Sequence, residues 1–144
     1  VNHPPGSAAD IHPENPEANP DTFFGNMGRI VSRLKKIEKD ARIFLVSMQR
    51  RGEIQGDPVI CAVTEEMKKM CRLFSFTYLI DMTRYGPVYD EEMRKTFALG
   101  FHPNAVGYYS YALMVGNYID YIIRQNPEDF FEVPFIGKNL KYRE

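Results

Sequence analysis

The sequence contains few of the residues that hold small proteins together covalently or through metals. Only two cysteines and three histidines occur among its 144 residues. Cys61 and Cys71 fall in a stretch expected to be one helix, where a separation of about 15 Å excludes a disulfide between them. No histidine has a second ligand at metal-binding spacing, and neither CxxC nor HExxH occurs. We therefore predict no disulfide, no bound metal and no cofactor.

Catalytic signatures are also missing. The sequence has no glycine-rich phosphate loop after a strand, no GxSxG nucleophile elbow, and no histidine that pairs with a cysteine by a known spacing. Adjacent carboxylates, such as those of Glu65 and Glu66, point to different sides of their helix and indicate no particular chemistry. We therefore predict that the chain is not an enzyme but a binding or assembly protein. A small all-helical enzyme built from scattered residues is the third and weakest alternative.

Signals for export or membrane insertion are absent as well. The N-terminal residues lack the basic region and apolar core of a signal peptide, which predicts a cytoplasmic protein or one assembled inside a cell. The longest apolar stretch, residues 105–123, approaches the length that spans a bilayer. Its five tyrosines, together with Asn117 and Asp120, argue against contact with lipid. We predict no membrane span and expect this stretch to be buried between helices or between subunits.

Basic residues are missing from the first 28 positions, and the charge of the chain is unevenly distributed. Residues 1–28 carry −4, residues 29–51 carry +6 and residues 52–144 carry −3, for a net charge of −1. A nearly neutral chain with one concentrated basic stretch is compatible with phosphate binding at that stretch. The alternative is a solvated helix face that lies opposite the core.

The basic stretch has the apolar period of an amphipathic helix from residue 26 to residue 51. Ile43 and Val46 fall within its basic face, so we expect that face to meet a second surface. The apolar stripe expected to face the core consists of Ile30, Leu34, Ile37, Ala41, Phe44, Leu45 and Met48. The candidate nucleic-acid-binding residues are Arg29, Arg33, Lys35, Lys36, Lys39, Arg42, Arg50 and Arg51.

The N-terminal segment is proline-rich. Residues 1–20 contain five of the ten prolines and hardly any bulky apolar side chains. Such a segment disfavours a helix and is biased toward extended, polyproline-like structure. Two possibilities follow, a disordered tail or an extended arm that lies on a neighbouring subunit. We favour the arm and assign it to residues 1–25.

The rest of the chain is expected to be helical. Asp57 followed by Pro58 predicts the start of a second helix that runs to about residue 84. Further helices are expected at residues 89–99 and 105–125, and residues 126–144 form an irregular, aromatic C-terminal segment. The predicted fold class is all-α, with a compact bundle of about four helices in a domain that spans residues 26–144.

An acidic proline-rich arm, a basic helix and a helical bundle together resemble the major capsid proteins of filamentous archaeal viruses. This resemblance covers the whole chain as architecture. It implies a structural protein that polymerises into a helical filament and packages double-stranded DNA without reading its sequence. The eight cations would face the phosphates, and the N-terminal arm would interlock copies of the chain.

Further contacts between copies, or with a related coat protein, would come from helix 105–125 and the C-terminal segment. The implied location is the virion, assembled in the host cytoplasm. The main alternative to this packaging role is a helical adaptor or accessory subunit that binds an acidic partner protein.

Overall fold

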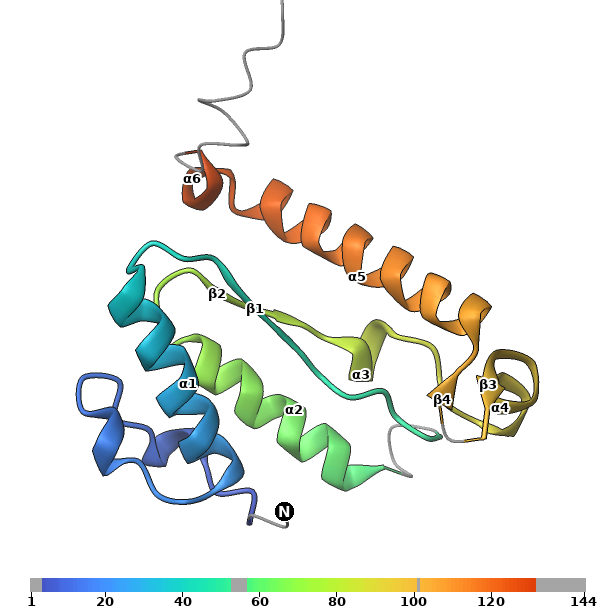
Figure 1. The fold of residues 1–144 in the computed structure, drawn as a ribbon, viewed down its shortest axis with the longest axis horizontal. Helices are drawn as coiled ribbons and strands as arrows, with labels where there is room; N and C mark the ends of the chain where they lie inside the picture. The colour runs from blue at the N-terminus through green and yellow to red at the C-terminus, as the bar shows by residue number, and fades with distance from the viewer. Residues whose placement is uncertain (1–3, 53–56, 101, 132–144) are drawn as a thin grey trace, which may run out of the picture.

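The computed structural model describes residues 4–52, 57–100 and 102–131 (Figure 1). Within these ranges the chain is mostly helical and contains two small sheets of two strands each. The helices are η1 (Ala8–Asp10), η2 (Pro16–Ala18), α1 (Phe23–Ile37), α2 (Pro58–Cys71), α3 (Met82–Tyr85), α4 (Glu91–Phe97), α5 (Ala105–Gln125) and α6 (Pro127–Phe130). The strands are β1 (Ile43–Val46), β2 (Thr77–Ile80), β3 (Ala98–Leu99) and β4 (His102–Pro103). The prediction of an all-α fold is therefore wrong for these strands.

A β-α-β unit forms the middle of the molecule. β1 and β2 pair in parallel, with Ile43 next to Thr77 and Val46 next to Ile80, and α2 makes the connection between them. In Figure 1, α1 and α2 lie on one face of this strand pair and α5 crosses the other face. Successive side chains of a strand point to opposite faces. Each strand therefore supplies residues to two apolar layers.

The two layers are separate clusters of buried residues. The first joins η1, α1 and α2, and the second joins the end of β2 with α3, α5 and α6. The buried members of the first cluster are Ala8, Ile11, Phe24, Val31, Met67, Met70 and Phe74, with Ile43, Leu45 and Leu79 packed against them. The buried members of the second are Ile80, Met82, Ile122 and Phe130, with Phe44 and Tyr78 among the side chains packed against them.

The predicted helix over residues 26–51 is wrong beyond Ile37. α1 ends there, and Glu38 caps it by donating its backbone N–H to the carbonyl of Leu34. The chain then enters β1, where Ile43 and Val46 occupy strand positions. β-branched side chains pack well on a pleated strand. Their poor fit to the basic face of a helix was therefore a sign of a strand.

The second predicted helix begins as expected but is shorter. Pro58 is its first residue and Asp57 its N-cap, yet α2 ends at Cys71. Phe76 then adopts a left-handed backbone conformation, with φ of 52°, just before β2. The apolar run expected to continue the helix to about residue 84 is instead a strand covered on both faces. Apolar periodicity alone does not distinguish these two structures.

The later helices follow the prediction more closely. α5 spans Ala105–Gln125 as predicted, and the side chain of Asn104 caps it by accepting the backbone N–H of Gly107. α4 lies within the predicted range 89–99 and is capped by Asp90. Phe130 of α6 is buried in the second cluster. Residues 132–144 of the predicted irregular C-terminal segment lie outside the described residues.

The prediction of an extended N-terminal arm is wrong for residues 4–22. This segment folds against its own chain, and Ala8 and Ile11 are part of the first apolar cluster. The Glu66 carboxylate on α2 accepts hydrogen bonds from the backbone N–H of Ala8 at 2.8 Å and from Ser7 Oγ at 3.0 Å. A Cβ atom on Gly28 would come within 2.8 Å of Ile11, so the segment lies directly against α1. Proline-rich composition did not prevent burial, because two apolar side chains and one carboxylate hold the segment in place.

Candidate functional site

The structure distributes the eight candidate cations over three places instead of one helix face. The helix that was expected to align them ends at Ile37, so the residues beyond it follow a turn and a strand. Arg29, Arg33, Lys35 and Lys36 lie on α1, Lys39 and Arg42 lie between α1 and β1, and Arg50 and Arg51 follow β1. The predicted continuous basic strip is therefore not present.

Two of the cations on α1 hold the N-terminal segment. The guanidinium of Arg29 donates to the backbone carbonyl of Asn19 and, at 2.6 Å, to the side-chain oxygen of Asn26. Arg33 forms an ion pair with Glu17 at 3.1 Å, and both side chains are mostly exposed. An exposed pair of this kind is worth little energy and leaves the guanidinium accessible to another anion. Arg29 thus has a structural role, whereas Arg33 remains available at the surface.

Lys35 and Arg42 both lie over the ring of Phe76. The Arg42 guanidinium lies 4.3 Å from the ring centroid and the Lys35 ammonium 5.5 Å from it. Lys35 also donates to the carbonyl of Ala41 at 2.6 Å, and the Nε of Arg42 donates to the carbonyl of Asp129 at 2.6 Å. Burial, followed by repulsion from Arg42, lowers the pKa of Lys35. These two cations are used in packing and do not face an external phosphate.

Lys36 and Lys39 differ from the other cations. Both are exposed, and neither has an ion-pair or hydrogen-bond partner for its ammonium group among the described residues. Lys36 lies one helical turn from Arg33, and Lys39 follows in the turn after α1. Arg51 is also exposed but lies beyond the opposite end of β1. Of the eight candidate cations, Arg33, Lys36 and Lys39 are therefore the exposed ones that lie together near the end of α1.

The apolar stripe predicted to face the core lies instead in solvent along α1. Its members on this helix are Ile30, Leu34 and Ile37, with exposed fractions of 60%, 43% and 84%, and Phe23 extends it with 42%. The positions that do face the core are Phe24, Gly28, Val31 and Ser32. The sequence pattern identified the apolar stripe but assigned it to the wrong environment. The small residues Gly28 and Ser32 gave no apolar signal for the true core face.

A second exposed apolar surface lies on α5. Val106, Tyr109 and Leu113 follow one another at spacings of three and four residues and are all exposed, as are Tyr108 and Tyr121. The other side of α5 packs through residues such as Ile122 against the second apolar cluster. One side of this helix is therefore buried within the chain, and burial of its other side between subunits stays a prediction.

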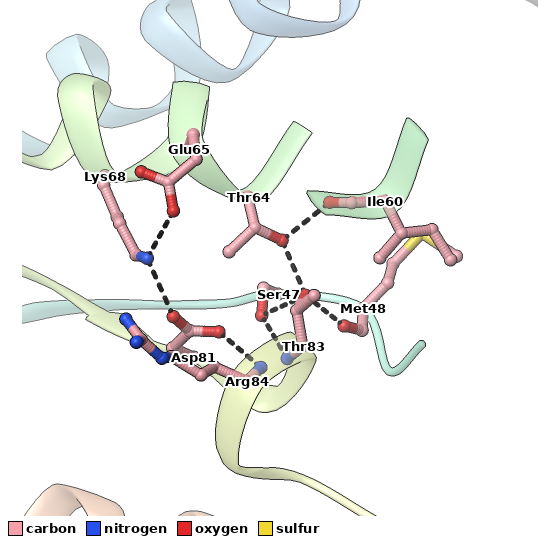
Figure 2. A network of polar contacts seen from close by, with 9 residues as sticks. All are labelled: Ser47, Met48, Ile60, Thr64, Glu65, Lys68, Asp81, Thr83 and Arg84. Carbon is pink, nitrogen blue, oxygen red and sulfur yellow. Dashed lines mark hydrogen bonds and ion pairs between the residues drawn. The ribbon is translucent and has the colours of Figure 1, made fainter. Parts of the chain in front are cut away.

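A network of polar contacts lies where β1 and β2 end (Figure 2). Thr83 Oγ1 lies 2.6 Å from both the carbonyl oxygen of Met48 and the hydroxyl of Thr64, and the Oγ of Ser47 accepts the backbone N–H of Thr83 at 3.1 Å. Ser47, Thr64 and Thr83 are all buried. Buried hydroxyls with such partners fix the relative positions of the segments that carry them. This network joins the end of β1, the middle of α2 and the start of α3.

A buried carboxylate lies beside this network. One oxygen of Asp81 accepts the backbone N–H of Arg84 at 2.8 Å, and the other lies 3.1 Å from the ammonium of Lys68. Hydrogen bonding to Glu65, which is 2.6 Å away, and to Asp81 raises the pKa of Lys68. A cavity of about 210 Å³ opens between these residues. Because the Lys68 ammonium compensates both the Glu65 and the Asp81 carboxylate, the arrangement stabilises the β-α-β unit.

Sequence reasoning did not identify Ser47, Thr64 and Thr83. The ends of parallel strands are places where polar groups converge, so recognition of β1 and β2 as parallel strands was the missing step.

Three further results bear on the predicted partners. Cys61 and Cys71 are free thiols in the structure. Within the part of the chain that the structure describes, no helix combines the length and apolarity needed to cross a bilayer, and no cluster of three or more His, Cys, Asp or Glu residues is placed to hold a metal. Comparison with protein-family models, with curated proteins and with solved structures found no match.

Proposed function

We propose that the chain is a structural subunit that polymerises with copies of itself into a helical assembly around nucleic acid. The observation that carries the proposal is the exposure of large apolar side chains in ordered stripes on two helices, α1 and α5. Contiguous exposed apolar surface usually marks a protein–protein contact. The two helices lie on opposite faces of the β1–β2 pair, so one subunit can contact neighbours on two sides (Figure 1). Two different contact surfaces are what an open, filament-forming arrangement requires.

The composition of the α5 surface supports a contact of this kind. Tyr108, Tyr109 and Tyr121 are exposed beside Val106 and Leu113. Tyrosine is enriched in protein interfaces, because the ring buries a large apolar area while the hydroxyl tolerates water. On an isolated monomer these side chains would expose their rings to solvent without any gain in stability.

The nucleic-acid part of the proposal depends on Arg33, Lys36 and Lys39. Each can contact a phosphate without reading a base, as sequence-independent packaging requires. Three phosphate contacts per subunit predict a salt dependence with a slope of about −3 in log K against log salt concentration, whereas eight contacts predict about −7. We propose double-stranded DNA as the cargo, and such a subunit would then be a coat protein of a virion.

Electrophoretic retardation of nonspecific double-stranded DNA and of RNA, measured at several salt concentrations, tests the packaging role. The Lys36→Glu/Lys39→Glu variant should lose retention. The matched control is Lys95→Glu/Arg124→Glu, which changes the net charge equally at exposed ion pairs on α4 and α5 and should retain DNA. Equal retention by both variants excludes the packaging role.

Sedimentation velocity tests the assembly role and separates it from the alternative of an adaptor with an acidic partner. A structural subunit should form polymers whose size grows with concentration. A single small species at all concentrations would favour the adaptor and contradict polymerisation.

A further inference from the structure

A cavity of about 550 Å³ opens between α3 and the middle of α5. Sites that bind small molecules typically have volumes of roughly 300–1,000 Å³. The lining consists of three tyrosines, two methionines and one asparagine, which are Tyr85, Tyr118, Tyr121, Met82, Met114 and Asn117. Within the part of the chain that the structure describes, no charged side chain lines this cavity.

The three tyrosine rings stand at steep angles to one another. The centroid of the Tyr118 ring lies 6.0 Å from that of Tyr85 and 6.0 Å from that of Tyr121, with interplanar angles of 54° and 82°. Tyr118 is half-buried, whereas Tyr85 and Tyr121 are 62% and 57% exposed. Because no two neighbouring rings are parallel, a flat ligand can stack on only one of them. A rounded group can contact all three.

The charges around the cavity compensate one another. Those of α5, of α3 and of the residue that caps α3 are two acids and two cations, Asp81, Arg84, Asp120 and Arg124. Asp120 and Arg124 form an ion pair at 2.8 Å. Asp81 shares Lys68 with Glu65, at distances of 3.1 Å and 2.6 Å. These six charges sum to zero, so the uncharged lining decides which ligand fits.

An aromatic lining of this kind suits a cation. The face of an aromatic ring attracts a cation within about 6 Å of its centroid, and the Arg84 guanidinium already lies 5.8 Å from the centroid of Tyr85. A lysine ammonium is strongly hydrated and needs acceptors for its N–H groups. No carboxylate among the described residues of this lining supplies them. A quaternary ammonium has no N–H group, so it loses no hydrogen bond when it leaves water for the rings.

We propose that Tyr85, Tyr118 and Tyr121 form a binding site for a quaternary ammonium group, such as the trimethylammonium of choline or of a trimethylated lysine. Met82 and Met114 offer apolar contacts to its methyl groups. This site goes beyond the proposed function and does not depend on polymerisation. Because Tyr121 also belongs to the exposed surface of α5, binding is measured on the full chain at concentrations too low for polymers to form.

An NMR titration with choline and with two analogues tests the chemistry of the site. The uncharged tert-butyl analogue, in which carbon replaces the nitrogen, has the same shape without the charge. It should bind about tenfold more weakly than choline, because it lacks the attraction between cation and ring. Ethanolamine keeps the charge but carries N–H groups, and it should also bind more weakly. Equal binding of choline and its tert-butyl analogue, or no saturable binding of choline, overturns the proposal.

A pair of equally exposed tyrosines on α5 provides a matched test of the residues. Tyr121→Leu removes one wall of the cavity and should weaken choline binding about tenfold. Tyr121→Phe keeps the ring and should bind as the wild type does. Tyr108 is 57% exposed, as Tyr121 is, but does not line the cavity, so Tyr108→Leu should leave binding unchanged. Equal affinities of Tyr121→Leu and Tyr108→Leu would overturn the proposal.

Two peptides that differ only in the trimethylation of one lysine distinguish the source of the group. Tighter binding of the trimethylated peptide than of choline would identify a methylated protein as the ligand, whereas binding no tighter than that of choline would identify a small molecule. Equal binding of the two peptides would overturn the proposal. A failure of polymerisation leaves this site unaffected, and a failure of choline binding leaves the proposed function unaffected.

Discussion

The guanidinium of Arg42 lies over the ring of Phe76, 4.3 Å from its centroid, and its Nε donates to the carbonyl of Asp129. This contact joins the turn before β1, the turn before β2 and the short helix α6. Phe76 also accepts the backbone N–H of Ile43 at 2.9 Å through its own carbonyl, from a left-handed backbone conformation. A residue predicted to bind phosphate is therefore one that holds the ends of the central strands together.

Replacing Arg42 by alanine should lower the free energy of unfolding by about 1–3 kcal/mol, because a cation–π contact and a hydrogen bond to a carbonyl are lost. Urea unfolding followed by circular dichroism measures this loss. Lys36→Ala is the matched control and should stay within about 0.5 kcal/mol of the wild type, because the Lys36 side chain is exposed. A stable Arg42→Ala chain that no longer retains DNA would contradict the structural role of Arg42.

The bounds of α5 could be predicted from the sequence, whereas the end of α1 and the role of Arg42 could not. Asn104 at a cap position and the long apolar period that follows it are local signals, and the bounds of α5 were predicted from them. The end of α1 at Ile37 has no such signal, since no glycine or proline occurs between it and β1. β1 exists because it pairs with β2, which lies more than thirty residues further along the chain. Long-range pairing of this kind overrides a local helical period.

Thr83→Val keeps the shape of the side chain and removes its hydroxyl from the network of Figure 2. The variant should lose about 1–3 kcal/mol of stability, because Ser47 and Thr64 are buried and lose a hydrogen-bond partner. Thermal or urea unfolding provides the measurement. Thr96→Val makes the same chemical change at an exposed position of α4 and should be nearly neutral. Equal stability of the two variants would mean that the network contributes nothing.

The network was not predictable for the same reason as β1. Ser47 and Thr83 are thirty-six residues apart, and their neighbours in the sequence carry no motif. Arg33, Lys36 and Lys39 were within the predicted set. The composition of the stretch could not show which of its eight cations would form contacts within the folded chain. Arg29 and Arg42 are held by Phe76, Asn19 and Asp129, which come close to these cations only in the folded chain.

The attachment of the N-terminal segment to α2 should weaken when Glu66 is protonated. Hydrogen bonding from Lys69, followed by that from the backbone N–H of Ala8, holds the pKa of Glu66 below its usual value of 4.5. The unfolded chain therefore binds this proton at higher pH than the folded chain. The stability due to Glu66 is present above about pH 4.5 and is lost as the pH falls through the lower folded pKa.

Glu66→Gln should remove this dependence. Urea midpoints of the wild type and the variant should differ most near neutral pH and converge as the pH falls below the lowered folded pKa of Glu66. Glu92→Gln, an exposed position on α4, should follow the wild type over the same range. A constant difference between Glu66→Gln and the wild type at every pH would show that the carboxylate does not act through its charge.

Cys71 should resist alkylation as long as the chain is folded. Burial raises the pKa of its thiol to about 12, so almost no thiolate, the form that attacks iodoacetamide, is present near neutral pH. Peptide mapping of the native chain after a timed reaction should show little modification at Cys71, whereas the same reaction in urea should modify it fully. Because Cys71 is the last residue of α2, early modification in the native state would mean that the junction between α2 and the turn leading to β2 opens readily. In that case the contact of Arg42 with Phe76 would also be too short-lived to stabilise the strand pair, and Arg42→Ala should then cost little.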